Sequence, residues 1–224
     1  MKEFPQKLKD DNYHALAKGI ISTIPTLGSP LSILFETVFS APLDKRKEKW
    51  FQSLAETIEK LINKVENLTP EILSQNEIFI SVSMQATQIA LRNHQKEKLD
   101  ALKNAIKNSI NIKFIDENKI LIFTRIIDDM TPLHLKILNF LSNPNKIKQD
   151  LQSKESKNTQ IFYSNNMTIW ENYYPEMSSS KILISQVCKE LYAKGFLSQE
   201  IQSLGVGKMT SNFGDDFLHF ISNS

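Results

Sequence analysis

The residue types that most often hold metals or transfer protons are sparse in this chain. It has one cysteine, and its four histidines lie far apart, at His14, His94, His134 and His219. Zinc sites place their ligands within a few residues of one another, and no histidine here has another histidine or the cysteine at such a spacing. We therefore expect no metal site and no cofactor. His134 and His219 adjoin apolar positions, which predicts partly buried structural side chains.

The candidates for nucleophilic or acid–base catalysis are equally weak. Cys188 falls on the inner face of a predicted helix, where a thiol behaves as a small hydrophobic side chain. The adjacent aspartates at 128–129 and at 215–216 would point about 100° apart on a helix, so neither pair can share a proton. The glycines and lysine at 205–208 lack the full pattern of a phosphate-binding loop. The sequence predicts a protein that is not an enzyme.

One set of polar and basic side chains has the chemistry needed to bind nucleic acid. Its members recur at about helical spacing, and one more lysine follows in a glycine-containing turn; they are Lys181, Ser185, Gln186, Lys189 and Lys208. Such side chains reach phosphates and base edges. The net charge of the chain is only +2, however, and Glu190 and Glu200 lie close by. A protein partner for the same surface is therefore an open alternative.

Two other groups of lysines are further places where a polyanion could bind. The first is the basic run at 45–49, which opens a predicted helix and could meet phosphates or anionic lipid. The second is a helical face with Lys96, Lys103 and Lys107. Charged runs of this kind are usually solvated faces, and this is the interpretation we favour for the run at 45–49.

Helices must hold these side chains in place. Glycine is scarce, with 6 residues, whereas the tight turns of all-β proteins need many. Apolar residues recur at spacings of three and four over 45–65, after the capping candidate Asn76, over 99–111 and after the capping candidate Asp116. The sequence therefore predicts a mainly α fold with an antiparallel helical bundle as a first domain, 1–130.

The remaining part, 131–224, shows a different order of elements. Thr131 and Pro132 begin a helix, and a second helix over 181–193 ends at Gly195. The residues at 196–197 and 204–209 predict a short β-hairpin, after which Thr210 caps a last helix. We expect a second domain over 131–224, with an insertion at about 143–179.

Three stretches of this part resemble winged-helix domains. Residues 131–138 (Thr-Pro-Leu-His-Leu-Lys-Ile-Leu) resemble the first helix of that family, and residues 191–197 (Leu-Tyr-Ala-Lys-Gly-Phe-Leu) resemble the end of its third helix. Residues 209–214 (Met-Thr-Ser-Asn-Phe-Gly) resemble the turn after its wing. The long insertion departs from the family pattern. The resemblance implies a winged-helix-like module that binds DNA or a protein partner.

The wider layout is similar to bacterial proteins of unknown role and to the abortive-infection alpha family of phage defence. An alternative function is therefore a membrane-linked defence or toxic effector that uses the apolar residues 19–35. This segment is shorter than the roughly 20 residues of a membrane span and contains Pro25 and Pro30, so we expect it to be packed in the resting protein. The single cysteine and the charged first residues predict a cytoplasmic protein.

Overall fold

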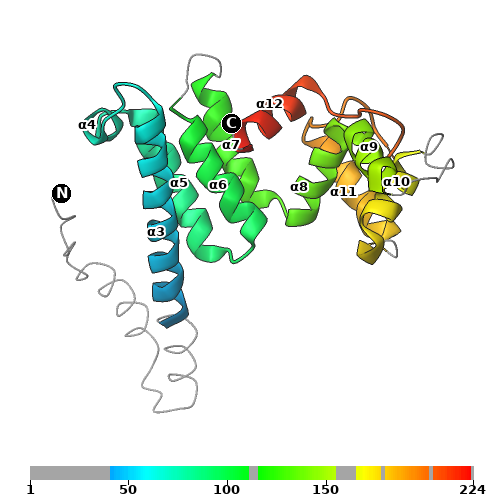
Figure 1. The fold of residues 1–224 in the computed structure, drawn as a ribbon, viewed down its shortest axis with the longest axis horizontal. Coiled ribbons are helices and arrows are strands. Elements are labelled where there is room, and N and C mark those ends of the chain that lie inside the picture. Colours follow the sequence, from blue (N-terminus) through cyan, green and yellow to red (C-terminus); the bar gives the residue numbers. More distant parts are fainter. Residues whose placement is uncertain (1–40, 111–115, 155–164, 178–179, 202–203, 223–224) are drawn as a thin grey trace, which may run out of the picture. The chain divides into compact units, whose positions relative to one another are not determined.

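The computed structural model describes residues 41–110, 116–154, 165–177, 180–201 and 204–222 (Figure 1). The chain divides into two compact units, Met1–Glu48 and Lys49–Ser224. Of the first unit, the described part is the start of helix α3 (Ala41–Lys64). The apolar segment 19–35, on which the membrane-linked alternative depends, lies outside the described residues. Within the described ranges, no helix is both long enough and apolar enough to cross a bilayer.

The described chain is mainly helical, as the sequence predicts. After α3 come α4 (Pro70–Ser74), α5 (Glu77–Arg92), α6 (Lys96–Asn108) and α7 (Glu117–Asp129). The predicted caps are confirmed, because the side chain of Asn76 accepts from the N–H of Phe79 and that of Asp116 accepts from the N–H of Asn118. Helix α5 packs against both α6 and α7.

The second half of the chain contains more helices than the sequence predicts. They are α8 (Pro132–Ser142), α9 (Pro144–Lys154), α10 (Asn166–Tyr173), the 3₁₀ helix η3 (Pro175–Met177), α11 (Lys181–Ala193) and α12 (Asn212–Ile221). Helices α9 and α10, together with η3, fall in the range 143–179 that we predicted to be an insertion. Thr131 caps α8 as predicted, whereas α12 is capped by Ser211, one residue later than expected.

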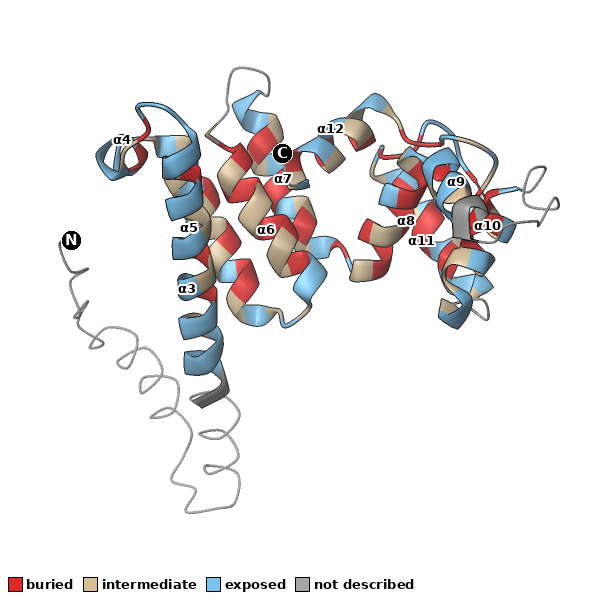
Figure 2. Cartoon of the chain, viewed as in Figure 1, coloured by how far each residue is buried: buried red, intermediate tan, exposed pale blue. Residues whose placement is uncertain are grey.

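The buried apolar side chains of Lys49–Ser224 form one main core that includes residues before and after position 130. Figure 2 marks the buried residues along the helices. Phe123 of α7 meets Phe213 and Phe217 of α12 edge-on, with ring centroids 4.9 and 5.3 Å apart. Asn108 of α6 donates from Nδ2 to the carbonyl oxygen of Phe220 at 2.8 Å. The last helix thus packs on α6 and α7. The predicted domain boundary at 130 stays a prediction.

The predicted β-hairpin is wrong, because the described residues contain no β-strand. Their pairing is limited to one antiparallel bridge between Leu197 and Thr210. A ladder would continue through the N–H groups of Phe196 and Met209, but both donate elsewhere. Phe196 donates to the carbonyl oxygen of Leu191 in α11 at 2.9 Å, and Met209 donates to that of Leu141 in α8 at 3.0 Å. The two N–H groups that would extend the ladder are therefore bonded to carbonyl groups near the C-terminal ends of α11 and α8.

The turn that we expected at the hairpin tip is held against α10. Asn166 is buried, and its Nδ2 donates to the carbonyl oxygens of Leu204 and Gly207, each at 2.8 Å. The N–H of Gly207 donates back to Asn166 Oδ1 at 3.2 Å. Gly205 and Gly207 both have positive φ, at 65° and 68°, which this tight path requires. The turn is therefore part of the packed body rather than a wing.

Candidate interaction surface

Helix α11 carries four of the five predicted site residues. One face of this helix is buried in the core, and the opposite face is exposed to solvent. The buried residues of α11 follow the helical repeat and lie on one side of the helix; they are Ile184, Val187, Cys188 and Leu191. They pack against α8 and the rest of the core. Burial raises the pKa of the Cys188 thiol to about 11, so this side chain acts as a small hydrophobic group, as the sequence predicts.

The outer face of α11 combines apolar and polar side chains. We use this name for Ile182, Leu183, Gln186, Lys189 and Tyr192. Ile182 is 88% exposed, more than any other large hydrophobic side chain that the structure describes, and Leu183 and Tyr192 are 53% and 41% exposed. Ile182, Gln186 and Lys189 are separated by four and three residues, so they align along the helix.

Two of the predicted site lysines are paired with carboxylates. Lys181 Nζ lies 3.0 Å from Glu171 Oε1 of α10. Lys208 Nζ lies 2.6 Å from Asp215 Oδ2 of α12, and Asp215 also accepts from Thr210 Oγ1 at 2.6 Å. Burial opposes ionisation of Asp215, but the hydrogen bonds from Lys208 and Thr210 prevail and lower its pKa. In each pair the carboxylate partly neutralises the lysine, so the lysine attracts a phosphate less strongly than an unpaired one.

The other three predicted residues differ in how freely they face solvent. Ser185 is partly buried. Gln186 is exposed, but its Nε2 donates to Glu190 Oε1 at 3.0 Å. Lys189 is exposed, and no ion pair to it occurs among the described residues. The structure therefore places four of the five residues on α11, whereas Lys208 lies in the turn held on α10 and pairs with α12.

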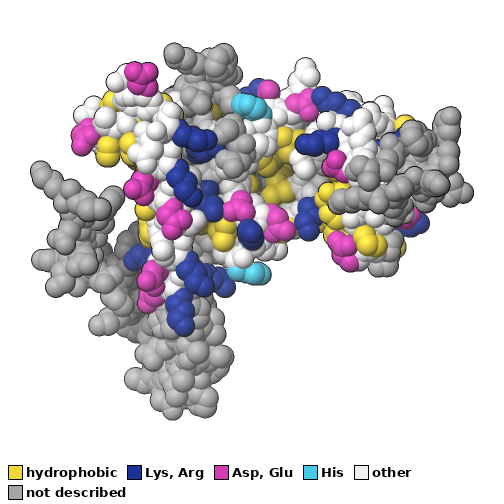
Figure 3. Space-filling model, viewed as in Figure 1, with side chains coloured by type: hydrophobic (Ala, Val, Ile, Leu, Met, Phe, Trp, Pro, Cys, Tyr) yellow, Lys and Arg dark blue, Asp and Glu magenta, His cyan; other side chains and the backbone are white. Residues whose placement is uncertain are grey.

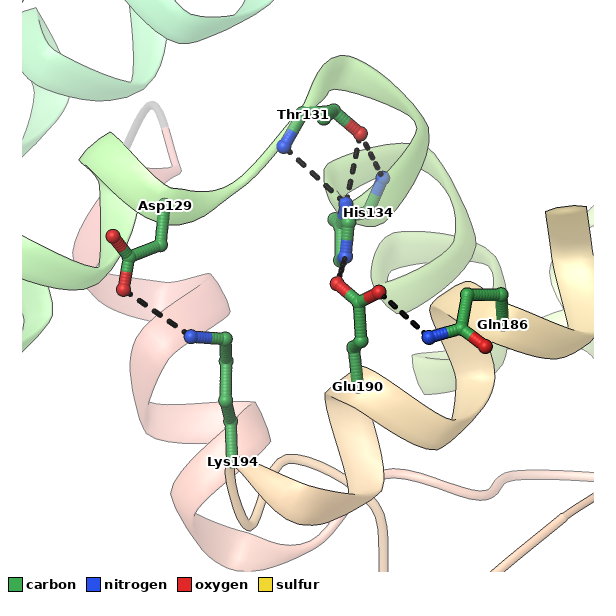
Figure 4. A network of polar contacts seen from close by, with 6 residues as sticks. All are labelled: Asp129, Thr131, His134, Gln186, Glu190 and Lys194. Carbon is green, nitrogen blue, oxygen red and sulfur yellow. Dashed lines mark hydrogen bonds and ion pairs between the residues drawn. The ribbon is translucent and has the colours of Figure 1, made fainter.

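A polar network links α8 to α11 at the edge of this surface (Figure 4). Thr131 and His134 form a capping box, in which the N–H of Thr131 donates to His134 Nδ1 at 3.3 Å. On the other side of the ring, Nε2 lies 3.0 Å from Glu190 Oε2. Nearby, Lys194 Nζ lies 3.2 Å from Asp129 Oδ2. The carboxylate of Glu190 thus binds both His134 and Gln186.

Sequence reasoning missed this network. The signal for its first half was present, because a threonine followed three residues later by a side chain with an acceptor is the capping-box spacing. Its second half joins His134 to Glu190, which lies 56 residues further along the chain, and no local pattern indicates that contact.

The two histidines for which the sequence predicts partial burial differ in their exposure. His134 is buried, more fully than the partial burial predicted, whereas His219 is exposed, so the prediction of a partly buried His219 is wrong. The buried residues of α12, Gly214, Phe217 and Phe220, lie on the opposite side from His219. Among the residues that the structure describes, no group of three or more His, Cys, Asp or Glu side chains is placed to hold a metal ion.

Comparison with known proteins adds no relative. No protein-family model matches the chain, and no curated protein or solved structure matches it either. The resemblance to the abortive-infection alpha family stays a prediction.

Proposed function

We propose that this chain is a non-enzymatic, intracellular binding protein that engages a protein partner through the outer face of α11. The observation that carries the proposal is the exposure of Ile182 and Leu183, 88% and 53%, on a helix whose other face is buried. Covering a fully exposed side chain of this size contributes roughly 1.5–3 kcal/mol. A partner that covers both side chains gains a hydrophobic centre for its interface.

The charges around this centre indicate what the partner presents. Lys181 is compensated by Glu171, and Glu190 accepts from Gln186 and lies against the ring of His134. Lys189 remains as an exposed cation with no ion pair among the described residues. Charge complementarity therefore calls for an apolar segment of the partner beside a carboxylate that reaches Lys189.

DNA is the other ligand predicted for this surface, and that prediction remains open. Phosphate binding depends on the number of basic side chains that can neutralise phosphates. The ion pairs of Lys181 and Lys208 with Glu171 and Asp215 put negative charge beside two of the three lysines in the set. This arrangement supports a protein partner in preference to DNA at α11.

The test begins with a photo-crosslinking amino acid placed at position 182 of the full chain, in cells of the source organism. A matched probe at position 84 serves as the control, because Met84 of α5 is also a highly exposed hydrophobic side chain, at 62%. A protein that crosslinks at 182 and not at 84 is then purified. Its Kd is measured by calorimetry against wild type, Ile182→Asp, Lys189→Glu and Met84→Asp.

We expect Ile182→Asp to weaken binding at least about tenfold, which corresponds to about 1.4 kcal/mol, and Met84→Asp to have little effect. Lys189→Glu should also weaken binding, and a carboxylate-to-lysine change in the partner should restore it. Equal crosslinking at both positions, or wild-type affinity of Ile182→Asp, would overturn the proposal. Crosslinking only to a second copy of this chain would also overturn it.

A further inference from the structure

A second surface, distinct from α11, lies on α3 and α6. Lysines on α3 at positions 49, 60 and 64 all lie within about 40° of Ser53 around the helix axis, given 3.6 residues per turn. Lysines on α6 at positions 96 and 107 lie within about 40° of Lys103 by the same geometry. Each helix therefore carries one row of lysines. We call the two rows together the lysine stripe; it consists of Lys49, Lys60, Lys64, Lys96, Lys103 and Lys107.

The two rows lie side by side. Lys103 Nζ donates to Ser53 Oγ at 3.1 Å, which joins the middle of α6 to α3. Towards the helix ends, burial and then the neighbouring ammonium of Lys64 hold the pKa of Lys107 below its usual value. Both helices therefore run in the same direction along this face. In Figure 3, Lys and Arg side chains lie over α3 and α6, with Asp and Glu side chains among them.

The charge of the stripe is concentrated relative to the whole chain. Two carboxylates, Glu56 and Asp100, lie at its edges, and Asp100 Oδ1 is 2.9 Å from Lys103 Nζ. Within about 60° of Ser53 on α3 and of Lys103 on α6, the stretches 49–64 and 96–108 thus carry six lysines and two acidic side chains, while the entire chain has a net charge of only +2. Like charges this close repel one another, and an anion that bridges them would relieve that repulsion.

We infer that the lysine stripe binds the phosphate backbone of a nucleic acid. The row on α3 spans about 22 Å from residue 49 to residue 64, at 1.5 Å per residue. One strand of duplex DNA carries a phosphate about every 3.4 Å along the axis, so about six phosphates fit this length. Lysine is a flexible point charge without the planar fork of arginine, so the stripe recognises charge and not base sequence.

The surroundings of the stripe favour nucleic acid over an anionic membrane. Helices that lie in a membrane interface place apolar side chains in the bilayer next to their basic face. On α3 the apolar residues Trp50, Leu54 and Leu61 are buried in the protein. The exposed Phe51 lies about 160° around the helix from Ser53, away from the stripe. Between residues 49 and 64 of α3, no exposed apolar side chain lies within about 90° of Ser53, so none can enter a bilayer beside these lysines.

The test measures fluorescence anisotropy of a labelled random-sequence duplex and a labelled single strand with the full chain at increasing salt. The stripe variant is Lys60→Gln, Lys64→Gln, Lys96→Gln, three exposed positions. The matched control is Lys181→Gln, Lys189→Gln, Lys208→Gln, which removes the same charge from the other predicted site. Circular dichroism verifies that both variants are folded. Vesicles of phosphatidylcholine with and without phosphatidylserine provide the membrane arm.

For wild type we expect a Kd of about 10⁻⁴ to 10⁻⁶ M at physiological salt, with a log–log salt slope of about −4 to −5 on duplex, the shallower value applying if the ion pair of Lys103 with Asp100 persists. The stripe variant should lose about half of that slope, since each contact contributes about 0.9. The control should keep the wild-type slope. No binding at low salt, equal losses in both variants, or binding to anionic vesicles without binding to nucleic acid would each overturn the inference. None of these results depends on a protein partner at α11.

Discussion

The imidazole of His134 joins the start of α8 to Glu190 of α11, with Nε2 3.0 Å from Oε2. The N–H of Thr131 donates to Nδ1, which leaves Nε2 as the ring nitrogen that faces the carboxylate. Gln186 donates to the second oxygen of the same carboxylate. Both carboxylate oxygens of Glu190 are therefore engaged, one by His134 of α8 and one by Gln186 of α11 (Figure 4).

This geometry predicts a pH-dependent contribution to stability. The hydrogen bond from Gln186, and then that from His134, hold the pKa of Glu190 below its usual value. A carboxyl group whose pKa is lower in the folded chain stabilises the fold above its unfolded pKa, and this contribution is lost as the pH falls through the folded pKa. The difference in free energy of unfolding between wild type and Glu190→Gln should therefore shrink from neutral pH to about pH 3.

Urea unfolding at several pH values measures this difference. The side chain of Glu190 is 44% exposed, so solvent screening limits the effect to less than about 1 kcal/mol. Glu200→Gln removes an exposed carboxylate outside the network and corrects for the change in net charge. A difference that stays constant over the whole pH range would contradict the role given to Glu190.

Asn166 is predicted to be the main support of the turn at 204–208. Asn166→Ala removes three side-chain hydrogen bonds at a buried position and should lower the free energy of unfolding by about 1–3 kcal/mol. Asn166→Asp should cost at least as much, because a carboxylate cannot donate to the two carbonyl oxygens. Asn172→Ala, on the exposed side of α10, is the control and should change stability little. Equal effects at positions 166 and 172 would rule out this support.

Gly214 is predicted to be required for close contact rather than for its backbone conformation. A Cβ at this position would lie 2.3 Å from the carbonyl oxygen of Phe196, a backbone atom that shifts less easily than the end of a flexible side chain. Alanine usually stabilises a helix relative to glycine by about 1 kcal/mol, but Gly214→Ala should destabilise this protein by roughly 1–3 kcal/mol. The measurement is the midpoint of urea unfolding.

The comparison for Gly214 is Gly195→Ala. Gly195 has a φ of 80° and open space around the position of a Cβ. Its substitution costs only the strain of a left-handed backbone, roughly 1–2 kcal/mol. A Gly214→Ala protein as stable as wild type would show that α12 can move away from Phe196.

Cys188 is predicted to be nearly inert in the folded protein. With its pKa raised from 9.0 to about 11, the thiolate fraction at pH 8 falls about 100-fold, and burial also blocks access. Alkylation by iodoacetamide should be at least that much slower in the native protein than in concentrated guanidinium chloride. Rapid alkylation without denaturant would show that α11 separates readily from the core.

Local chemistry makes part of this fold predictable. The caps at Asn76, Asp116 and Thr131 each depend on a side chain and an N–H group two or three residues away, so the sequence alone indicates them. The false hairpin arose because glycines and apolar residues indicate a turn but not its partner. Where the N–H of Met209 donates is decided by Leu141, 68 positions earlier in the chain.

The candidate sites, like the fold, were predictable where they depend on neighbouring residues and not where they depend on contacts between distant parts of the chain. Helical spacing was sufficient to place Lys181, Gln186 and Lys189 on α11. It could not show that Glu171 compensates Lys181, because α10 reaches α11 only after the chain has folded back. The lysine stripe was visible from the sequence as one row on α6. Its second row became apparent only when Ser53 was found beside Lys103, which brings α3 alongside.

The two tryptophans of the chain give it a pair of built-in optical probes. Trp50 of α3 is buried, and its indole N–H donates to Thr87 Oγ1 of α5 at 3.0 Å. Trp170 of α10 is buried against Phe140 and Tyr174. The indole N–H of Trp170 has no hydrogen-bond partner among the described residues. Replacing either indole with phenylalanine leaves the emission of the other. A chain with Trp170 alone then reports how the region around α10 opens, and a chain with Trp50 alone reports when α3 leaves α5.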